Sequence, residues 1–371
     1  MVHQKLPALS SKGCYIASSV GSKKLHRLVD RCSFFSSASA SQSNNPSTSR
    51  PKFALPSYIG QSQPVPKTTL PSTPPPHHPQ QDHAMQHHQH NVANAIRPSY
   101  QSQTPLLLPN LLCNCDAIYF WRSSDYWRAA VGEDTPVEVE VGKSYNSGNR
   151  VTLRFGDYLD YLALGVEQED KDYEKQQQQG GGSQQQGKDI EEQQQAEQEV
   201  AYLAQNELFP RVLNDIPIPN FCESDKYNVG EGQLYHTMLW MGPRHTVSPL
   251  HFDPLDNLLM QVVGWKRVLL FPPDKLHESG DVEEDSKQNN QILGSNEQPT
   301  WHYAGTNGNQ YNTSAVDIEN PNHKEFPNFK ELAPIPYECV LGPGDALYIP
   351  KRWWHHVRSL EMSVSANVWW R

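Results

Sequence analysis

The stretch SPLHFDPLDNLLMQVVGWKRVLLF, residues 248–271, decides how the rest of the chain is interpreted. It contains His251 and Asp253, separated by one residue. On an extended strand, residues i and i+2 project from the same face, so the imidazole and the carboxylate would point into one cavity. A single His-x-Asp pair is common and by itself is more often an ordinary polar pair than a metal site. A metal site here therefore needs a further ligand from elsewhere in the chain.

The second half of this stretch predicts two buried strands. NLLMQVV and KRVLLF are apolar runs separated by a turn at Gly264 and Trp265, which is the pattern of two antiparallel strands. Lys266 begins the second run and is a cation among apolar residues. Periodicity alone favours a surface lysine of a hairpin. A buried lysine would instead pair with the carboxylate of a ligand.

A candidate third ligand lies far downstream, in GPGDALYIPKRWWHHV. Gly344, Pro350 and His355 have the spacing of the second metal-binding motif of cupin barrels, and Asn367 follows after a further strand. The two halves, in this order, support each other as parts of one metal site.

Two histidines and one carboxylate on one face of a metal leave three coordination positions open, as in non-haem Fe(II) oxygenases. We therefore predict an iron site at His251, Asp253 and His355. Lys266 in the same cavity would fit the far carboxylate of a dicarboxylic cosubstrate such as 2-oxoglutarate.

Composition limits what the whole chain can be. It has 371 residues, 36% of them hydrophobic, with 30 prolines and long Gln, Ser and His tracts that are not typical of a core. Single barrels of about 200–250 residues are common, so one domain suffices. The six cysteines are scattered without a zinc-site pattern, which favours free thiols in a reducing compartment. No apolar run approaches the roughly 18 residues of a membrane span.

The chain divides into a tail and a catalytic domain. Residues 1–104 are predicted to be a disordered basic tail, and residues 105–371 a catalytic domain with polar insertions near 174–198 and 278–310. Residues 1–81 contain nine Lys and Arg residues and one acidic residue, a net charge of about +8. The remainder of the chain therefore has a net charge of about −18. A part this acidic suits a basic protein substrate better than nucleic acid. Nucleus or cytoplasm is the expected location, and mitochondrial targeting by residues 1–50 is a weaker alternative.

The segments between the polar tracts predict a mainly β fold. TPVEVEVG, residues 135–142, alternates as a strand does, whereas residues 155–162 place apolar side chains at helical spacing. Short strands with turn signals between them fit a double-stranded β-helix, a cupin-like jelly roll, with flanking N-terminal helices.

The chain resembles a known family over about residues 119–371. HFDPLDNLLMQVVGWKRVLLFPP with GDALYIPKRWWHHVRSLEMSVSANVWW resembles the Jumonji-C (JmjC) oxygenases. PVEVEVGKSY, AYLAQNELF, WMGP and VDIENP are most similar to the Jumonji-domain protein 5 group, also called lysine demethylase 8. Oxygenases that hydroxylate wybutosine in transfer RNA share part of the pattern. The resemblance implies a double-stranded β-helix that uses Fe(II), 2-oxoglutarate and oxygen.

The resemblance places the iron ligands on His251, Asp253 and His355. The adjacent His356 competes with His355. Since consecutive strand residues point to opposite faces, only one of the two can face the iron. The spacing from Pro350 selects His355 and leaves His356 on the other face as a structural residue.

The resemblance also implies binding residues for the cosubstrate and the substrate. Lys266, with Tyr202 and Ser248, would hold the distal carboxylate of 2-oxoglutarate, and Asn257 would lie near the iron. The residues implied for the substrate are Glu140, Tyr145 and Trp240. Glu140 has the chemistry to bind a guanidinium, but it could equally be a solvated glutamate on a strand.

Several functions remain open on the sequence alone. The favoured one is an Fe(II)- and 2-oxoglutarate-dependent hydroxylase of a protein side chain, in particular arginyl. The alternatives are an N-methyl-lysine (histone) demethylase, a hydroxylase of wybutosine in transfer RNA, and a non-catalytic cupin binding module. An intact triad together with Lys266 argues against the binding module. The expected partner is a basic protein or peptide, and no association with a membrane is expected.

Overall fold

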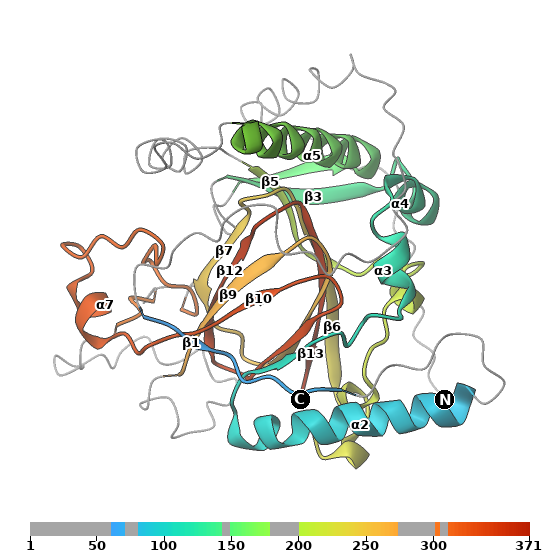
Figure 1. Cartoon of the computed structure of the whole chain (residues 1–371), viewed down its shortest axis with the longest axis vertical. Helices are drawn as coiled ribbons and strands as arrows, with labels where there is room; N and C mark the ends of the chain where they lie inside the picture. The colour runs from blue at the N-terminus through green and yellow to red at the C-terminus, as the bar shows by residue number, and fades with distance from the viewer. Residues whose placement is uncertain (1–60, 71–80, 143–148, 179–199, 274–300, 305–310) are drawn as a thin grey trace, which may run out of the picture.

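The computed structural model describes residues 61–70, 81–142, 149–178, 200–273, 301–304 and 311–371. Two sheets form the walls of a barrel (Figure 1), one in the order β1-β10-β9-β12-β7 and the other in the order β2-β11-β8-β13-β6-β5-β3-β4. This confirms the predicted mainly β, jelly-roll fold. The strands are β1 (Gln63–Pro64), β2 (Leu106–Leu108), β3 (Pro136–Gly142), β4 (Arg150–Arg154), β5 (Val200–Glu207), β6 (Leu234–Gly242), β7 (Val247–His251), β8 (Asp256–Val263), β9 (Lys266–Phe271), β10 (Tyr337–Leu341), β11 (Ala346–Ile349), β12 (Trp354–Ser359) and β13 (Ser363–Trp370).

Helices cover the large sheet and one end of the barrel. Helix α5 lies along β3 and β5 (Figure 1), and the residues predicted to form its apolar face, Phe155, Tyr158, Leu159 and Leu162, are all buried. No helix in the described ranges is both long and apolar enough to span a membrane. The helices are α2 (Gln81–Ser102), α3 (Asp116–Phe120), α4 (Ser124–Val131), α5 (Phe155–Gln178) and α7 (Pro327–Leu332), with 3-10 turns η2 (Leu213–Asp215), η3 (Asn220–Cys222) and η4 (Asp225–Tyr227).

The two apolar runs of the opening stretch form strands, but the prediction that they pair with each other is wrong. Strand β8 pairs with β11 and β13, whereas β9 pairs with β10 and β12 in the other sheet. The turn at Gly264 therefore carries the chain from one sheet to the other. Its φ is +70°, and a Cβ there would lie 2.1 Å from the Met362 carbonyl oxygen. Every residue of both strands is buried, so the sequence has no polar face that could indicate the pairing partner.

The prediction of a disordered tail up to residue 104 is wrong for its last part. Helix α2 lies across one end of the barrel (Figure 1) and packs against η3 and η4, and its Val92, Ala93 and Ile96 are buried in the main hydrophobic core. The Arg97 guanidinium donates two hydrogen bonds to the carbonyl oxygen of Tyr227, at 3.0 and 2.7 Å. The segment is so rich in Gln and His that its overall composition does not indicate this short apolar face. Deleting residues 1–104 would therefore remove part of the core.

We expect Ile96→Ala to lower the free energy of unfolding by about 2–5 kcal/mol, the usual cost of such a core cavity. Asn94→Ala, on the exposed side of the same helix, should change it by less than about 1 kcal/mol. Chemical denaturation of both variants measures the difference. Equal stability of Ile96→Ala and the unmodified chain would mean that α2 is not part of the folded core.

The polar insertions predicted near 174–198 and 278–310 fall mostly outside the described residues. Helix α5 continues to Gln178, beyond the expected start of the first insertion. Trp301 and His302, near the end of the second, are buried. The Trp301 ring packs against Phe271 and Trp354, at centroid distances of 5.1 and 5.9 Å, so this end of the segment belongs to the core.

Candidate metal centre

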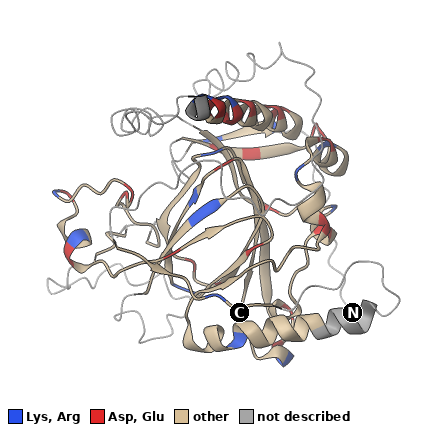
Figure 2. Ribbon diagram, in the orientation of Figure 1, with Lys and Arg blue, Asp and Glu red and all other residues tan. Residues whose placement is uncertain are grey.

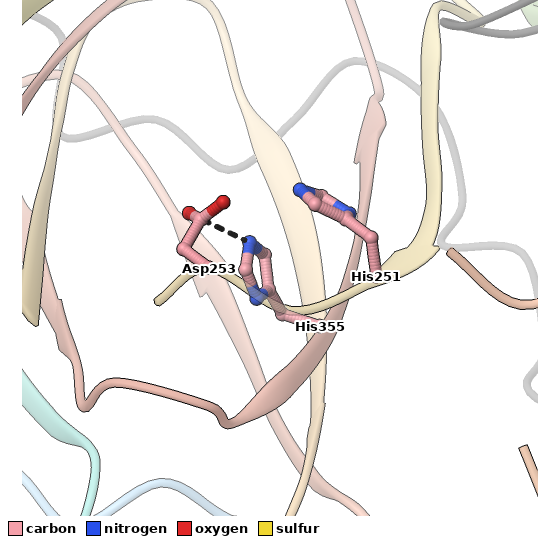
Figure 3. Close-up of side chains that lie close together, drawn as sticks. All are labelled: His251, Asp253 and His355. Carbon is pink, nitrogen blue, oxygen red and sulfur yellow. Dashed lines mark ion pairs between the residues drawn. The ribbon is translucent and has the colours of Figure 1, made fainter. Parts of the chain in front are cut away.

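The two predicted metal-binding histidines lie on neighbouring strands. His251 is the last residue of β7, and the register places it directly opposite His355 of β12. Asp253 follows in the loop after β7, just beyond the strand on which the His-x-Asp pair was expected. Figure 3 shows the three side chains converging from these elements. One ligand atom from each of the three lies within 4.8 Å of the others, and His355 Nε2 is 3.7 Å from Asp253 Oδ2.

The backbone fixes which nitrogen of each imidazole is available. His251 Nδ1 lies 2.7 Å from the Pro249 carbonyl oxygen, and His355 Nδ1 lies 2.9 Å from that of Trp353. A carbonyl only accepts, so each Nδ1 carries the proton and each Nε2 keeps a lone pair. Such a second hydrogen bond is the usual way in which proteins orient a histidine that ligates a metal.

The electrostatic setting keeps His355 neutral. Burial, followed by the neighbouring His251, lowers its pKa to about 4, although Asp253 opposes this shift. A metal competes with protons for the imidazole, so a histidine that is already neutral at physiological pH is ready to bind one. The geometry of the three residues and the neutral form of His355 fit a divalent cation with open coordination positions.

His356 lies on the other face of β12, as expected. Its Nε2 is 3.9 Å from the Glu319 carboxylate, which in turn accepts hydrogen bonds from Arg358. Burial lowers the His356 pKa to about 4, despite the opposing effect of Glu319. This histidine belongs to a buried polar cluster outside the barrel.

We therefore expect His355→Ala to abolish metal binding and His356→Ala to retain it. The reason is that only His355 directs Nε2 toward Asp253, whereas loss of His356 removes a contact behind the sheet. Calorimetric titration with Mn(II), combined with a thermal melt of each variant, measures both properties. The reverse order of metal affinities would show that the other neighbour is the ligand.

A pocket opens beside the three residues. The atom-free space there, which includes part of the open solvent, is about 370 Å³. Its walls contain every residue expected to hold the cosubstrate, along with Trp240. The four are Tyr202, Ser248, Asn257 and Lys266.

Lys266 is a buried cation in this pocket. It is 2% exposed, and its Nζ donates a hydrogen bond of 2.6 Å to Ser365 Oγ. Burial lowers the pKa of its ammonium group to about 7. Within the described part of the chain, no carboxylate forms an ion pair with it. The side chain predicted to be either a surface lysine or a ligand-binding one is therefore inside the barrel.

The structure places the three expected substrate residues differently. Trp240 lines the pocket, whereas Tyr145 lies outside the described residues. Glu140, only 5% exposed, is paired in register with Tyr202 of β5 and therefore shares its face of the sheet. Its Oε1 accepts hydrogen bonds from Nε and Nη2 of Arg150, at 3.1 and 2.8 Å. The carboxylate expected to bind a guanidinium thus already holds one from its own chain.

Two residues of β13, Asn367 and Trp369, also line the pocket, although the sequence assigned neither a role in binding the metal, the cosubstrate or the substrate. The alternation of SVSANVWW was the available signal, because it places Ser365, Asn367 and Trp369 on one face of the strand. What the sequence does not give is which strands that face meets.

The chain is similar to known proteins over most of its length. Residues 93–371 match the family model described as a cupin-like domain. The chain is 32% identical to "Lysine-specific demethylase JMJ30" of Arabidopsis thaliana (74% of this chain, 52% of the relative) and 34% identical to "Lysine-specific demethylase 8" of Danio rerio (67% and 48%). It is 30% identical to "Jumonji C domain-containing protein 5" of Drosophila melanogaster (73% and 55%). The chain spans about half the length of these relatives.

Proposed function

The chain belongs to the cupin-like JmjC family, and on that basis we propose that it is an Fe(II)- and 2-oxoglutarate-dependent oxygenase of protein side chains. One observation carries the proposal. The three convergent side chains His251, Asp253 and His355 share a pocket with a buried lysine that has no carboxylate partner in the described chain. Iron would bring oxygen activation and oxidation of a C–H bond to this site.

The chain's own residues would bind and orient the reactants. His251, Asp253 and His355 would hold the metal beside the pocket. Lys266, with Ser248 and Tyr202 beside it in the pocket wall, binds the distal carboxylate of 2-oxoglutarate. A buried ammonium without a charged partner is costly, and a ligand carboxylate would offset that cost. Trp240 and Trp369 exclude water from the same space.

We expect 2-oxoglutarate to bind less tightly as the pH rises above about 7. The ammonium form of Lys266 is the form that pairs with a carboxylate, and its pKa in the empty pocket is about 7. Above that pH the competent fraction falls about tenfold per unit, and the apparent dissociation constant rises in proportion until the pKa of the complex is reached. Binding at pH 8 should therefore take up a proton.

Calorimetry with Mn(II) in place of iron, in two buffers of different ionisation enthalpy, measures both the affinity and the proton uptake. Lys266→Arg is the matched control, because a guanidinium stays charged throughout this range and should flatten the pH profile. A wild-type profile as flat as that of Lys266→Arg would contradict the assignment of Lys266.

The proposed substrate is a basic protein or peptide, hydroxylated on an arginyl side chain. The Glu140 carboxylate supports this, since it binds the guanidinium of Arg150 on the face of the sheet that carries Tyr202. Arg150 is half-exposed and would be displaced by an incoming arginine. Acidic residues along α5, beside the same sheet, add an attractive field for a basic chain (Figure 2).

A second candidate is demethylation of N-methyl-lysine, which is favoured by the names of two relatives. Mass spectrometry separates the two reactions after incubation of the protein with Fe(II), 2-oxoglutarate and matched peptides containing arginine or methylated lysine. A gain of one oxygen on arginine supports the hydroxylase, and loss of a methyl group from lysine supports the demethylase. If neither product forms and 2-oxoglutarate is not consumed, both proposed activities are contradicted.

A further inference from the structure

The inner face of β13 is polar along its length. Ser363, Ser365, Asn367 and Trp369 alternate with Val364, Ala366, Val368 and Trp370, which lie in the main hydrophobic core. All four residues of the inner face are at most 9% exposed. Buried polar groups require partners, so this face must meet complementary groups inside the barrel.

Two hydrogen-bonding paths lead from this face to Asp253. The Trp369 indole Nε1 donates to Asp253 Oδ2 at 3.1 Å. Along the other path, Asn367 Nδ2 donates to Asn257 Oδ1 at 3.1 Å, and Asn257 Nδ2 donates to Asp253 Oδ2 at 3.2 Å. Asn367 Oδ1 in turn accepts from the indole Nε1 of Trp240 at 2.8 Å. The same carboxylate oxygen thus receives two N–H groups.

The direction of the longer path is fixed by its first member. An indole nitrogen can only donate, so Asn367 must turn its oxygen toward Trp240 and its NH₂ toward Asn257. Asn257 must then present its own oxygen to Asn367, which leaves its NH₂ for Asp253. Each amide has one orientation that satisfies both neighbours, and a wall of the pocket is thereby connected to the carboxylate.

We infer that Trp369, together with Asn367 acting through Asn257, positions the Asp253 carboxylate for the metal. This inference rests on the proposed function in that it takes Asp253 as a metal ligand. Two donors on one oxygen fix the rotation of the carboxylate, so the ligand is set in place before the cation arrives. Trp369 and Asn367 are positioning residues because they act through Asp253.

The decisive comparison is Trp369→Phe with Trp370→Phe. Both tryptophans are buried on β13 and both donate an indole hydrogen bond, but Trp370 donates to the carbonyl oxygen of Val229 in the outer core. We expect Trp369→Phe to weaken Mn(II) binding by about 10- to 100-fold. Trp370→Phe should leave Mn(II) affinity unchanged. Both variants should lower thermal stability by a similar amount. Equal Mn(II) affinities of the two variants would overturn the inference.

Trp240→Phe tests the longer path from its far end. An aromatic ring is kept, but the indole N–H that orients Asn367 is lost. Asn367 and Asn257 both lie between this position and Asp253 along the path. Loss of one orienting hydrogen bond should weaken Mn(II) binding by about 2- to 10-fold in the absence of any peptide. Unchanged affinity would reduce the inference to Trp369 alone.

Electron paramagnetic resonance of bound and free Mn(II), read without turnover, gives the affinity of each variant. Failure of the unmodified protein to bind Mn(II) would contradict the proposed function, and the inference with it. Tight binding by the unmodified protein and equally tight binding by Trp369→Phe would leave the proposed function intact and overturn the inference alone.

Discussion

Asp253→Ala should abolish turnover of 2-oxoglutarate while leaving the fold intact. The carboxylate supplies the negative charge of the site, and it lies in a loop rather than in the core packing. Structural zinc sites with four protein ligands bind with about 10–16 kcal/mol, so one ligand of such a site contributes about 3 kcal/mol, or about two powers of ten in affinity. We therefore expect Mn(II) binding to be at least about 100-fold weaker and residual turnover to be about 1% or less.

Consumption of 2-oxoglutarate by the purified protein, with circular dichroism and a thermal melt as folding checks, gives the result directly. Asp125→Ala is a suitable control, since this aspartate is exposed in the first turn of α4. The control should keep full turnover. Comparable turnover in Asp253→Ala and the control would remove the assignment of the metal centre.

Much of the fold could be predicted from the sequence, because short strands separated by turns have few ways to pack. The strand at residues 135–142 and the helix from Phe155 were found by periodicity and agree with the structure. Pairing could not be found in this way. Strands β8 and β9 are buried on both faces, so their sequence does not distinguish a hairpin from a crossover between sheets. Helix α2 was missed because three buried apolar residues are outnumbered by polar neighbours.

The site was predictable where the spacing of residues along one strand determines the face to which each side chain points. Alternation along β12 predicts opposite faces for His355 and His356, and in the structure His355 lies beside Asp253 whereas His356 lies beside Glu319. The same alternation along β13 puts Trp369 on the face that lines the pocket. Contacts between distant segments were not predictable. The sequence does not reveal that the Arg150 guanidinium binds the Glu140 carboxylate, or that Asp253 accepts a hydrogen bond from the Trp369 indole N–H. Those contacts depend on strand register, which only the folded barrel determines.

Lys266→Ala should raise the requirement for 2-oxoglutarate steeply while metal binding changes little. The lysine is 2% exposed, and its Nζ has a serine hydroxyl as its hydrogen-bond partner among the described residues. Removing it would leave the distal carboxylate of the ligand buried without a countercharge. Breaking a buried ion pair by removing one partner costs about 3–5 kcal/mol, or about two to four powers of ten in affinity. His251, Asp253 and His355 remain in place, so the Mn(II) affinity should stay within about twofold.

Three further variants separate charge from shape. Lys266→Met keeps most of the length and should lose nearly as much affinity as alanine, because the charge is what matters. Lys266→Arg should recover only part of the loss, since a planar guanidinium needs a wider pocket than an ammonium. Lys351→Ala, at an exposed position beside β12, should bind 2-oxoglutarate normally. If titration gave Lys266→Ala the affinity of Lys351→Ala, the buried lysine would have only a packing role, and the assignment of a dicarboxylate to this pocket would lose its main support.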